Sequence, residues 1–186
     1  MLVRAMIVPF TRISSTVVRS TPASTSRWFS ALTTATLAAL KAKLKALEEA
    51  GFAYAVAPPA ITDAIRAVVA LADLVLIPVK PSPHDLRAVW RTVEIAREGG
   101  KGFCFVLTQA KGNALLTVQA MAALSEHGVV APAVMHDRVD YASSMTDGRT
   151  VLEADPKGRS AAEMAALWKF VKGRLQESTH ARKAAA

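Results

Sequence analysis

The stretch LVLIPVKPSPHD, residues 74–85, decides the fold of this 186-residue chain. It begins with a continuous apolar run rich in β-branched side chains, which is typical of a strand buried on both faces of a sheet. A helix start follows, because Ser82 can cap a helix, Pro83 suits its first turn and Asp85 favours the positive end of its dipole. A buried strand that leads into a helix is typical of a βαβ unit, so this stretch predicts a parallel sheet covered by helices.

The same alternation of apolar strands and amphipathic helices extends along the chain in both directions. We expect helices over 37–50, 61–72, 83–98, 115–127 and 138–145, and strands over 52–56, 103–107 and 129–134. The fold class is therefore α/β, with a mostly parallel sheet flanked by helices. Ligands of such sheets bind beyond the carboxyl ends of the strands. Those ends are expected near Ala57, Val79–Lys80, Thr108–Gln109 and Met135–His136.

The last helix of this pattern begins at Ser160. Ser160 and Glu163 have the spacing of a capping box, in which each side chain bonds the backbone of the other residue. The buried stripe of this helix is expected to consist of Met164, Ala165, Trp168, Val171 and Leu175. Residues 176–186 are interpreted as a tail, and residues 37–175 as one domain.

The N-terminal segment, residues 1–36, differs from the rest of the chain. The net charge of the whole chain is +8, and its first acidic residue is Glu48, so most of the charge lies before that point. The segment is basic and rich in Ser and Thr, and we expect it to be irregular. Three interpretations compete: the remnant of a missing N-terminal part, an organellar targeting peptide within residues 1–30, and a secretory signal, which fits worst because Arg12 and Arg19 interrupt its apolar core.

Several kinds of site find little support in the sequence. Cys104 is the single cysteine, so the chain can form no internal disulfide or thiolate zinc site, and Cys104 is expected to be buried. The four histidines show no metal-ligand spacing, and no Ser-His-Asp or Cys-His arrangement is visible. No apolar run is long enough for a membrane-spanning helix.

Four motifs together resemble the ParA family of plasmid and chromosome partition ATPases, in the ParA/MinD branch of P-loop proteins. They are Pro58-Pro59-Ala60, the run 72–85, the strand end 105–109, and the region from Tyr141 to Glu153. The resemblance covers about residues 52–175. It implies a P-loop NTPase-like fold and, in complete members, ATP and magnesium as cofactors.

Two functional parts of that family are missing from the sequence. The family's phosphate-binding loop, of the form KGGxGKT, does not occur, and we expect the first strand of the fold to be missing with it. Val56 stands where the resemblance implies an aspartate that helps to hold magnesium. We therefore expect a truncated or degenerate member without ATPase activity of its own, with no catalytic residue, no metal ligand and no bound cofactor.

The resemblance nevertheless implies candidate binding residues. Those for a nucleotide are Pro58, Pro59, Thr108, Gln109, His136 and Asp137. Those for DNA lie late in the chain, where the family binds DNA non-specifically, and are Arg138, Arg149, Lys169, Lys172 and Arg174.

The function expected from this resemblance is DNA partition, that is, plasmid or chromosome segregation, in the cytoplasm and associated with the nucleoid. The implied partners are non-specific DNA, a ParB-like centromere-binding protein, and a second chain in a homodimer or in a heterodimer with a full-length relative. The alternative is a non-catalytic binding module that pairs with a full-length ParA-like protein or with its centromere-binding partner.

Overall fold

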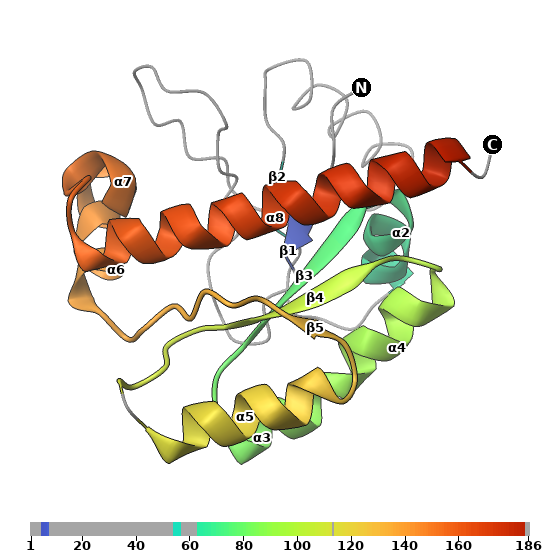
Figure 1. Cartoon of the computed structure of the whole chain (residues 1–186), viewed down its shortest axis with the longest axis horizontal. Coiled ribbons are helices and arrows are strands. Elements are labelled where there is room, and N and C mark those ends of the chain that lie inside the picture. The colour runs from blue at the N-terminus through green and yellow to red at the C-terminus, as the bar shows by residue number, and fades with distance from the viewer. Residues whose placement is uncertain (1–4, 8–53, 57–62, 113, 185–186) are drawn as a thin grey trace. The chain divides into compact units, whose positions relative to one another are not determined.

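The computed structural model describes residues 5–7, 54–56, 63–112 and 114–184. Pro58, Pro59 and the helix expected over 37–50 lie outside these ranges. The chain divides into two compact units, one formed by Met1–Ile77 with Val89–Phe103 and the other by Pro78–Ala88 with Cys104–Ala186. Figure 1 shows the helices and strands with the labels used below.

The first unit is built on parallel strands. β1 (Ala5–Ile7) lies between β2 (Tyr54–Val56) and β3 (Leu74–Val79), with Ala5 aligned with Tyr54 on one side and with Leu74 on the other. Residues 1–36 were expected to be irregular and the first strand of the fold to be missing, and for Ala5–Ile7 these expectations are wrong. The physical reason is local, because the apolar, β-branched composition around these residues suits a central strand.

Two helices complete the first unit. α2 (Asp63–Leu71) and α4 (Trp90–Glu98) pack against each other, and an exposed ion pair joins Arg66 to Glu98. The core contains Val69, Val75 and Val93, which are at most 2% exposed. β3 is the apolar run at residues 74–79, and its burial confirms the strand predicted there.

The second unit contains the helix α3 and a βαβ unit. α3 (Pro83–Ala88) begins as predicted, because the Asp85 N–H donates to Ser82 Oγ and the Ser82 hydroxyl donates to the Asp85 carboxylate. β4 (Phe103–Leu107) pairs in parallel with β5 (Val129–Val130), and α5 (Leu115–Ser125) connects them. This βαβ unit confirms the α/β class.

A run of helices ends the second unit: α6 (Val139–Ser144), a 3-10 turn η1 (Met145–Asp147), α7 (Val151–Ala154) and α8 (Arg159–Ala184). The core beneath them consists of Val106, Ala131 and Met135, against which Tyr141, Met164, Leu167 and Phe170 pack. The packing of this apolar stripe against the core of the unit stabilises α8.

Two expectations about α8 are wrong. The helix continues to Ala184, as its uninterrupted ribbon in Figure 1 shows, so residues 176–184 are helical rather than a tail. Strong helix formers and the i,i+3 pair of Arg174 with Glu177 favour this extension. Ala165 and Trp168 were expected in the core, but both are exposed, Trp168 to 39%, and Leu167 and Phe170 pack there instead.

Candidate functional site

A hollow of about 520 Å³ lies beyond the carboxyl ends of β4 and β5. Two loops line it, Ala110–Gly112 after β4 and His136–Arg138 after β5, together with Arg159 at the start of α8. This is the edge of a parallel sheet at which the sequence predicted a ligand site.

Backbone hydrogen bonds hold the two loops together. Ala110 and His136 form an isolated parallel bridge, in which the Ala110 N–H donates to the Met135 carbonyl at 3.2 Å and the Asp137 N–H donates to the Ala110 carbonyl at 2.9 Å. Gln109, directly before this bridge, has φ 51°, in the left-handed region that non-glycine residues rarely adopt. Such local strain is found preferentially at ligand sites.

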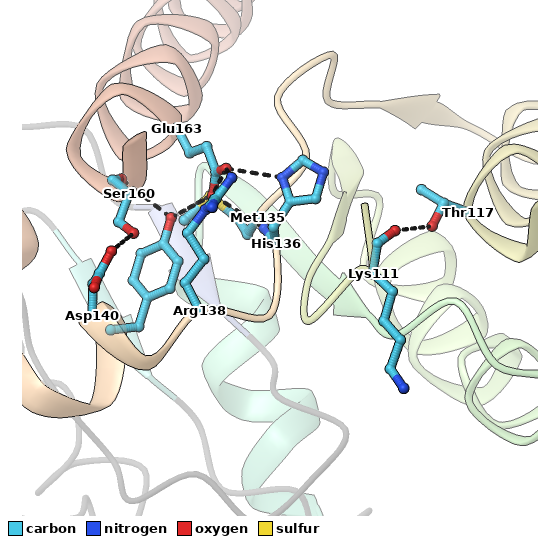
Figure 2. A network of polar contacts seen from close by, with 9 residues as sticks. Lys111, Thr117, Met135, His136, Arg138, Asp140, Ser160 and Glu163 are labelled. Atoms are coloured by element: carbon cyan, nitrogen blue, oxygen red, sulfur yellow. Dashed lines mark hydrogen bonds and ion pairs between the residues drawn. The ribbon is translucent and has the colours of Figure 1, made fainter. Parts of the chain in front are cut away.

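The carboxylate of Glu163, on α8, accepts hydrogen bonds from the His136–Arg138 loop. Its Oε1 accepts hydrogen bonds from Arg138 Nε at 3.0 Å, Arg138 Nη2 at 2.9 Å and His136 Nδ1 at 2.8 Å. Its Oε2 accepts from the His136 backbone N–H at 3.1 Å and from the Tyr141 hydroxyl at 2.9 Å. Figure 2 shows His136 and Arg138 converging on Glu163.

These contacts change the ionisation of the groups involved. Burial alone would raise the pKa of Glu163, but the hydrogen bonds from Arg138, the His136 N–H and Tyr141 outweigh burial and lower the pKa to about 2. The pKa of Tyr141 is raised, first by burial and then by its hydrogen bond to Glu163. The hydrogen bond to Glu163 also raises the pKa of Arg138. Glu163 is therefore an ionised carboxylate at neutral pH.

The capping box predicted for Ser160 and Glu163 does not form. Ser160 Oγ donates to Asp140 Oδ2 at 2.7 Å, and Glu163 turns to the loop after β5. Tertiary hydrogen bonds, including two from a guanidinium, outcompete the local backbone contact that the spacing suggested. A Thr–Glu pair with the same spacing does bond at α7, where the Thr150 N–H donates to Glu153 Oε2 at 2.8 Å.

The candidate nucleotide residues divide into three groups. His136 and Asp137 line the hollow, whereas Thr108 and Gln109 precede the lining loop, with the Thr108 N–H bonded to the Val79 carbonyl. Pro58 and Pro59 lie outside the described residues. Val56, at the position expected for an aspartate, is the last residue of β2.

The candidate DNA residues all lie in the second unit. Lys169 and Lys172 are exposed on α8, and Arg149 is exposed after η1. Arg138 is engaged by Glu163, and Arg174 pairs with Glu177 at 2.7 Å. Lys169 and Lys172 are one helical turn apart, so these two exposed cations lie on the same face of α8.

Sequence reasoning missed four residues of the site: Lys111, Tyr141, Arg159 and Glu163. Lys111 follows the end of β4, and this position could have identified it as a lining residue. Arg159 is the first residue of α8. Glu163 could not be found from the sequence, because its partners lie more than 20 positions away along the chain. Within the described ranges, no group of three or more His, Cys, Asp or Glu is arranged to hold a metal ion.

The fold and this site define a class, the α/β proteins with a parallel sheet flanked by helices and a hollow at the carboxyl ends of its strands. No protein-family model matches the chain. A curated relative, maintenance of carboxysome distribution protein A of Halothiobacillus neapolitanus, is 30% identical over 113 residues, which are 57% of this chain and 52% of the relative. The chain therefore spans about half the length of this relative.

Solved structures have the same fold. The septum site-determining protein MinD of Pyrococcus horikoshii is similar with a TM-score of 0.59, at 12% identity, over 74% of this chain and 57% of that one. A ParA family ATPase of Chlorobium tepidum is similar with a TM-score of 0.58, at 14% identity, over 89% and 86%. At these identities the solved structures show that the chain has their fold, which confirms the P-loop NTPase-like fold that the resemblance implied.

Proposed function

We propose that this chain is a ParA-like DNA partition protein that binds DNA non-specifically through α8 and does not hydrolyse ATP by itself. The observation that carries the proposal is the charge of α8, which has six lysines and arginines against two glutamates. Lys169 and Lys172 are both exposed on this helix. Two exposed lysines one helical turn apart suit contacts to the phosphates of duplex DNA, and such contacts carry no sequence information.

The hollow supports a nucleotide as the second ligand. Lys111 and Arg159 line it, together with Arg138, whose charge Glu163 neutralises, and Asp137 is its one acidic lining residue. Positive charge at the carboxyl ends of parallel strands suits an anionic ligand such as a nucleotide. The sequence contains no KGGxGKT loop, and Val56 cannot ligate magnesium. We therefore propose that the hollow binds a nucleotide and that hydrolysis does not follow.

In this proposal the chain acts in the cytoplasm, associated with the nucleoid, and works with a ParB-like centromere-binding protein. Titration of labelled duplexes followed by fluorescence anisotropy tests the DNA claim. We expect equal affinity for several unrelated sequences of one length. Strong preference for one sequence, or no binding at low salt, would contradict the proposal.

A second candidate function, a non-catalytic module that pairs with a full-length relative, is favoured by α5. Leu115, Leu116 and Val118 on this helix are 70%, 53% and 65% exposed. Apolar side chains grouped on one exposed helix are typical of protein interaction sites. Size-exclusion chromatography of the chain mixed with a full-length ParA-like protein distinguishes the two functions, because only the second requires a stable mixed complex that Leu116→Asp disrupts.

The part of the chain described by the structure contains no helix that is long and apolar enough to cross a membrane.

A further inference from the structure

Trp168, on α8, is an exposed aromatic side chain that the proposed function does not use. It is 39% exposed, whereas Phe170 on the same helix packs against the core. Among the Phe, Tyr and Trp side chains within residues 63–112 and 114–177, it is the one that is exposed rather than buried or half-buried. Part of a large indole therefore faces solvent on the helix for which DNA binding is proposed.

The neighbours of Trp168 along α8 are positively charged. Lys172 lies four positions later in the sequence, so the two side chains are neighbours on the helix surface. Lys169 follows Trp168 directly, and both lysines are exposed. No acidic residue occurs between Glu163 and Glu177, so no carboxylate of α8 lies within four positions of either lysine. The exposed indole thus lies beside two cations of the same helix.

Cations and an aromatic ring recognise different parts of a nucleic acid. Lysines bind the phosphates of duplexes and of single strands alike. An aromatic side chain stacks on nucleobases, whose faces are covered by neighbouring bases in a duplex and are accessible in a single strand. An exposed ring beside exposed cations is therefore the combination typical of single-strand binding.

We propose that Trp168 stacks on a base of single-stranded DNA while Lys169 and Lys172 bind its phosphates, so that α8 binds single strands as well as duplexes. The inference rests on the proposed binding of DNA by α8. Because every base has a π-face, stacking is tolerant of sequence, in agreement with a non-specific binding surface. Duplex binding uses the two lysines and gains nothing from the indole.

The contribution of stacking is measured by fluorescence anisotropy with labelled probes of about 12 nucleotides: an oligothymidine, an abasic strand with the same phosphates, and a duplex. We expect the unmodified chain to bind the oligothymidine about tenfold more tightly than the abasic strand, which is the effect of one base–aromatic stack. Trp168→Ala is expected to remove this preference and to leave the duplex affinity unchanged, whereas Trp168→Phe keeps a ring and retains part of the preference. The matched control is Leu152→Ala, which truncates a 41% exposed side chain on α7 and is expected to change none of the three affinities.

A second measurement reports the contact without changing Trp168. In a chain with Trp28→Phe and Trp90→Phe, Trp168 is the one remaining tryptophan. We expect the oligothymidine to quench its fluorescence, and the abasic strand and the duplex to leave it nearly unchanged. Equal affinities for the oligothymidine and the abasic strand, equal losses of oligothymidine and duplex affinity in Trp168→Ala, or unchanged fluorescence with bound oligothymidine overturn this inference alone. Failure of all three probes to bind overturns the proposed DNA binding as well.

Discussion

Oε1 of Glu163 lies 3.0 Å from Nε and 2.9 Å from Nη2 of Arg138, so one oxygen of α8 accepts two hydrogen bonds from the loop that follows β5. The side chain of Glu163 is 14% exposed and that of Arg138 is 28% exposed. This contact ties the longest helix of the second unit to the rim of the hollow, and it is the basis of the first two predictions.

Replacement of Glu163 by alanine is expected to lower the free energy of unfolding by about 2 kcal/mol, because Arg138 and the His136 N–H lose a charged acceptor that water replaces poorly. Urea denaturation measures this loss. The matched control is Glu177→Ala, whose side chain is 65% exposed and pairs with Arg174 at the surface. Exposed pairs contribute little, so the control is expected to stay within about 0.5 kcal/mol of the unmodified chain. Equal losses in both variants would contradict the prediction.

The stability contribution of Glu163 is expected to depend on pH. Its pKa is lowered from 4.5 to about 2 in the folded chain, so its charge stabilises the fold above pH 4.5 and the contribution is lost as the pH falls toward 2. The difference in unfolding free energy between the unmodified chain and Glu163→Gln should therefore be constant near neutral pH and shrink in acid. Denaturation curves from neutral pH down to about pH 3 measure it. A difference that grows in acid would show that the sign is wrong.

Cys104 is expected to react slowly with alkylating reagents. The thiol is fully buried in β4, and burial raises its pKa to about 12, against the opposing charge of Arg174. Since only the thiolate is nucleophilic, we expect iodoacetamide to label the native chain at least a hundredfold more slowly than the urea-unfolded chain, as a rough estimate. Intact-mass spectrometry over time follows the reaction. Similar rates in both states would contradict the burial of this residue.

Purified protein is expected to show no magnesium-dependent ATP turnover above background, with or without duplex DNA. The reason is the sequence, which has no KGGxGKT loop and has valine at position 56. Phosphoryl transfer depends on the positioning and charge stabilisation that these groups supply. A steady-state phosphate-release assay measures it, and turnover that EDTA abolishes would contradict the proposed loss of hydrolysis.

The parts of the fold that local physics controls could be predicted from the sequence. The Ser82 cap and the strand at 74–79 depend on neighbouring residues, and both are confirmed. The helix α5 is also confirmed, and in it Leu115 and Val118 are exposed while Ala120 and Leu124 are buried. The almost uniformly apolar composition of α5 gives no clear periodicity from which the buried side could be chosen.

The location of the site could be predicted from the sequence, but its hydrogen-bond network could not. The rule that ligands bind at strand ends led to His136 and Asp137, which line the hollow. The network around Glu163 was missed because the local spacing favoured a cap with Ser160, whereas Arg138 and Tyr141 approach from another part of the chain. Long-range hydrogen bonds leave no periodic pattern in a sequence.

The central claim, that α8 binds DNA through phosphate contacts, is tested most directly by the salt dependence of binding to a random-sequence duplex. Each phosphate contact contributes about 0.9 to the slope of log affinity against log salt. We predict that Lys169→Ala with Lys172→Ala makes this slope shallower by about two, whereas the control Arg87→Ala with Arg91→Ala, which removes the same charge from exposed positions of α3 and α4, leaves it unchanged. Equal slopes in the two double variants, or binding that does not respond to salt, would contradict the account.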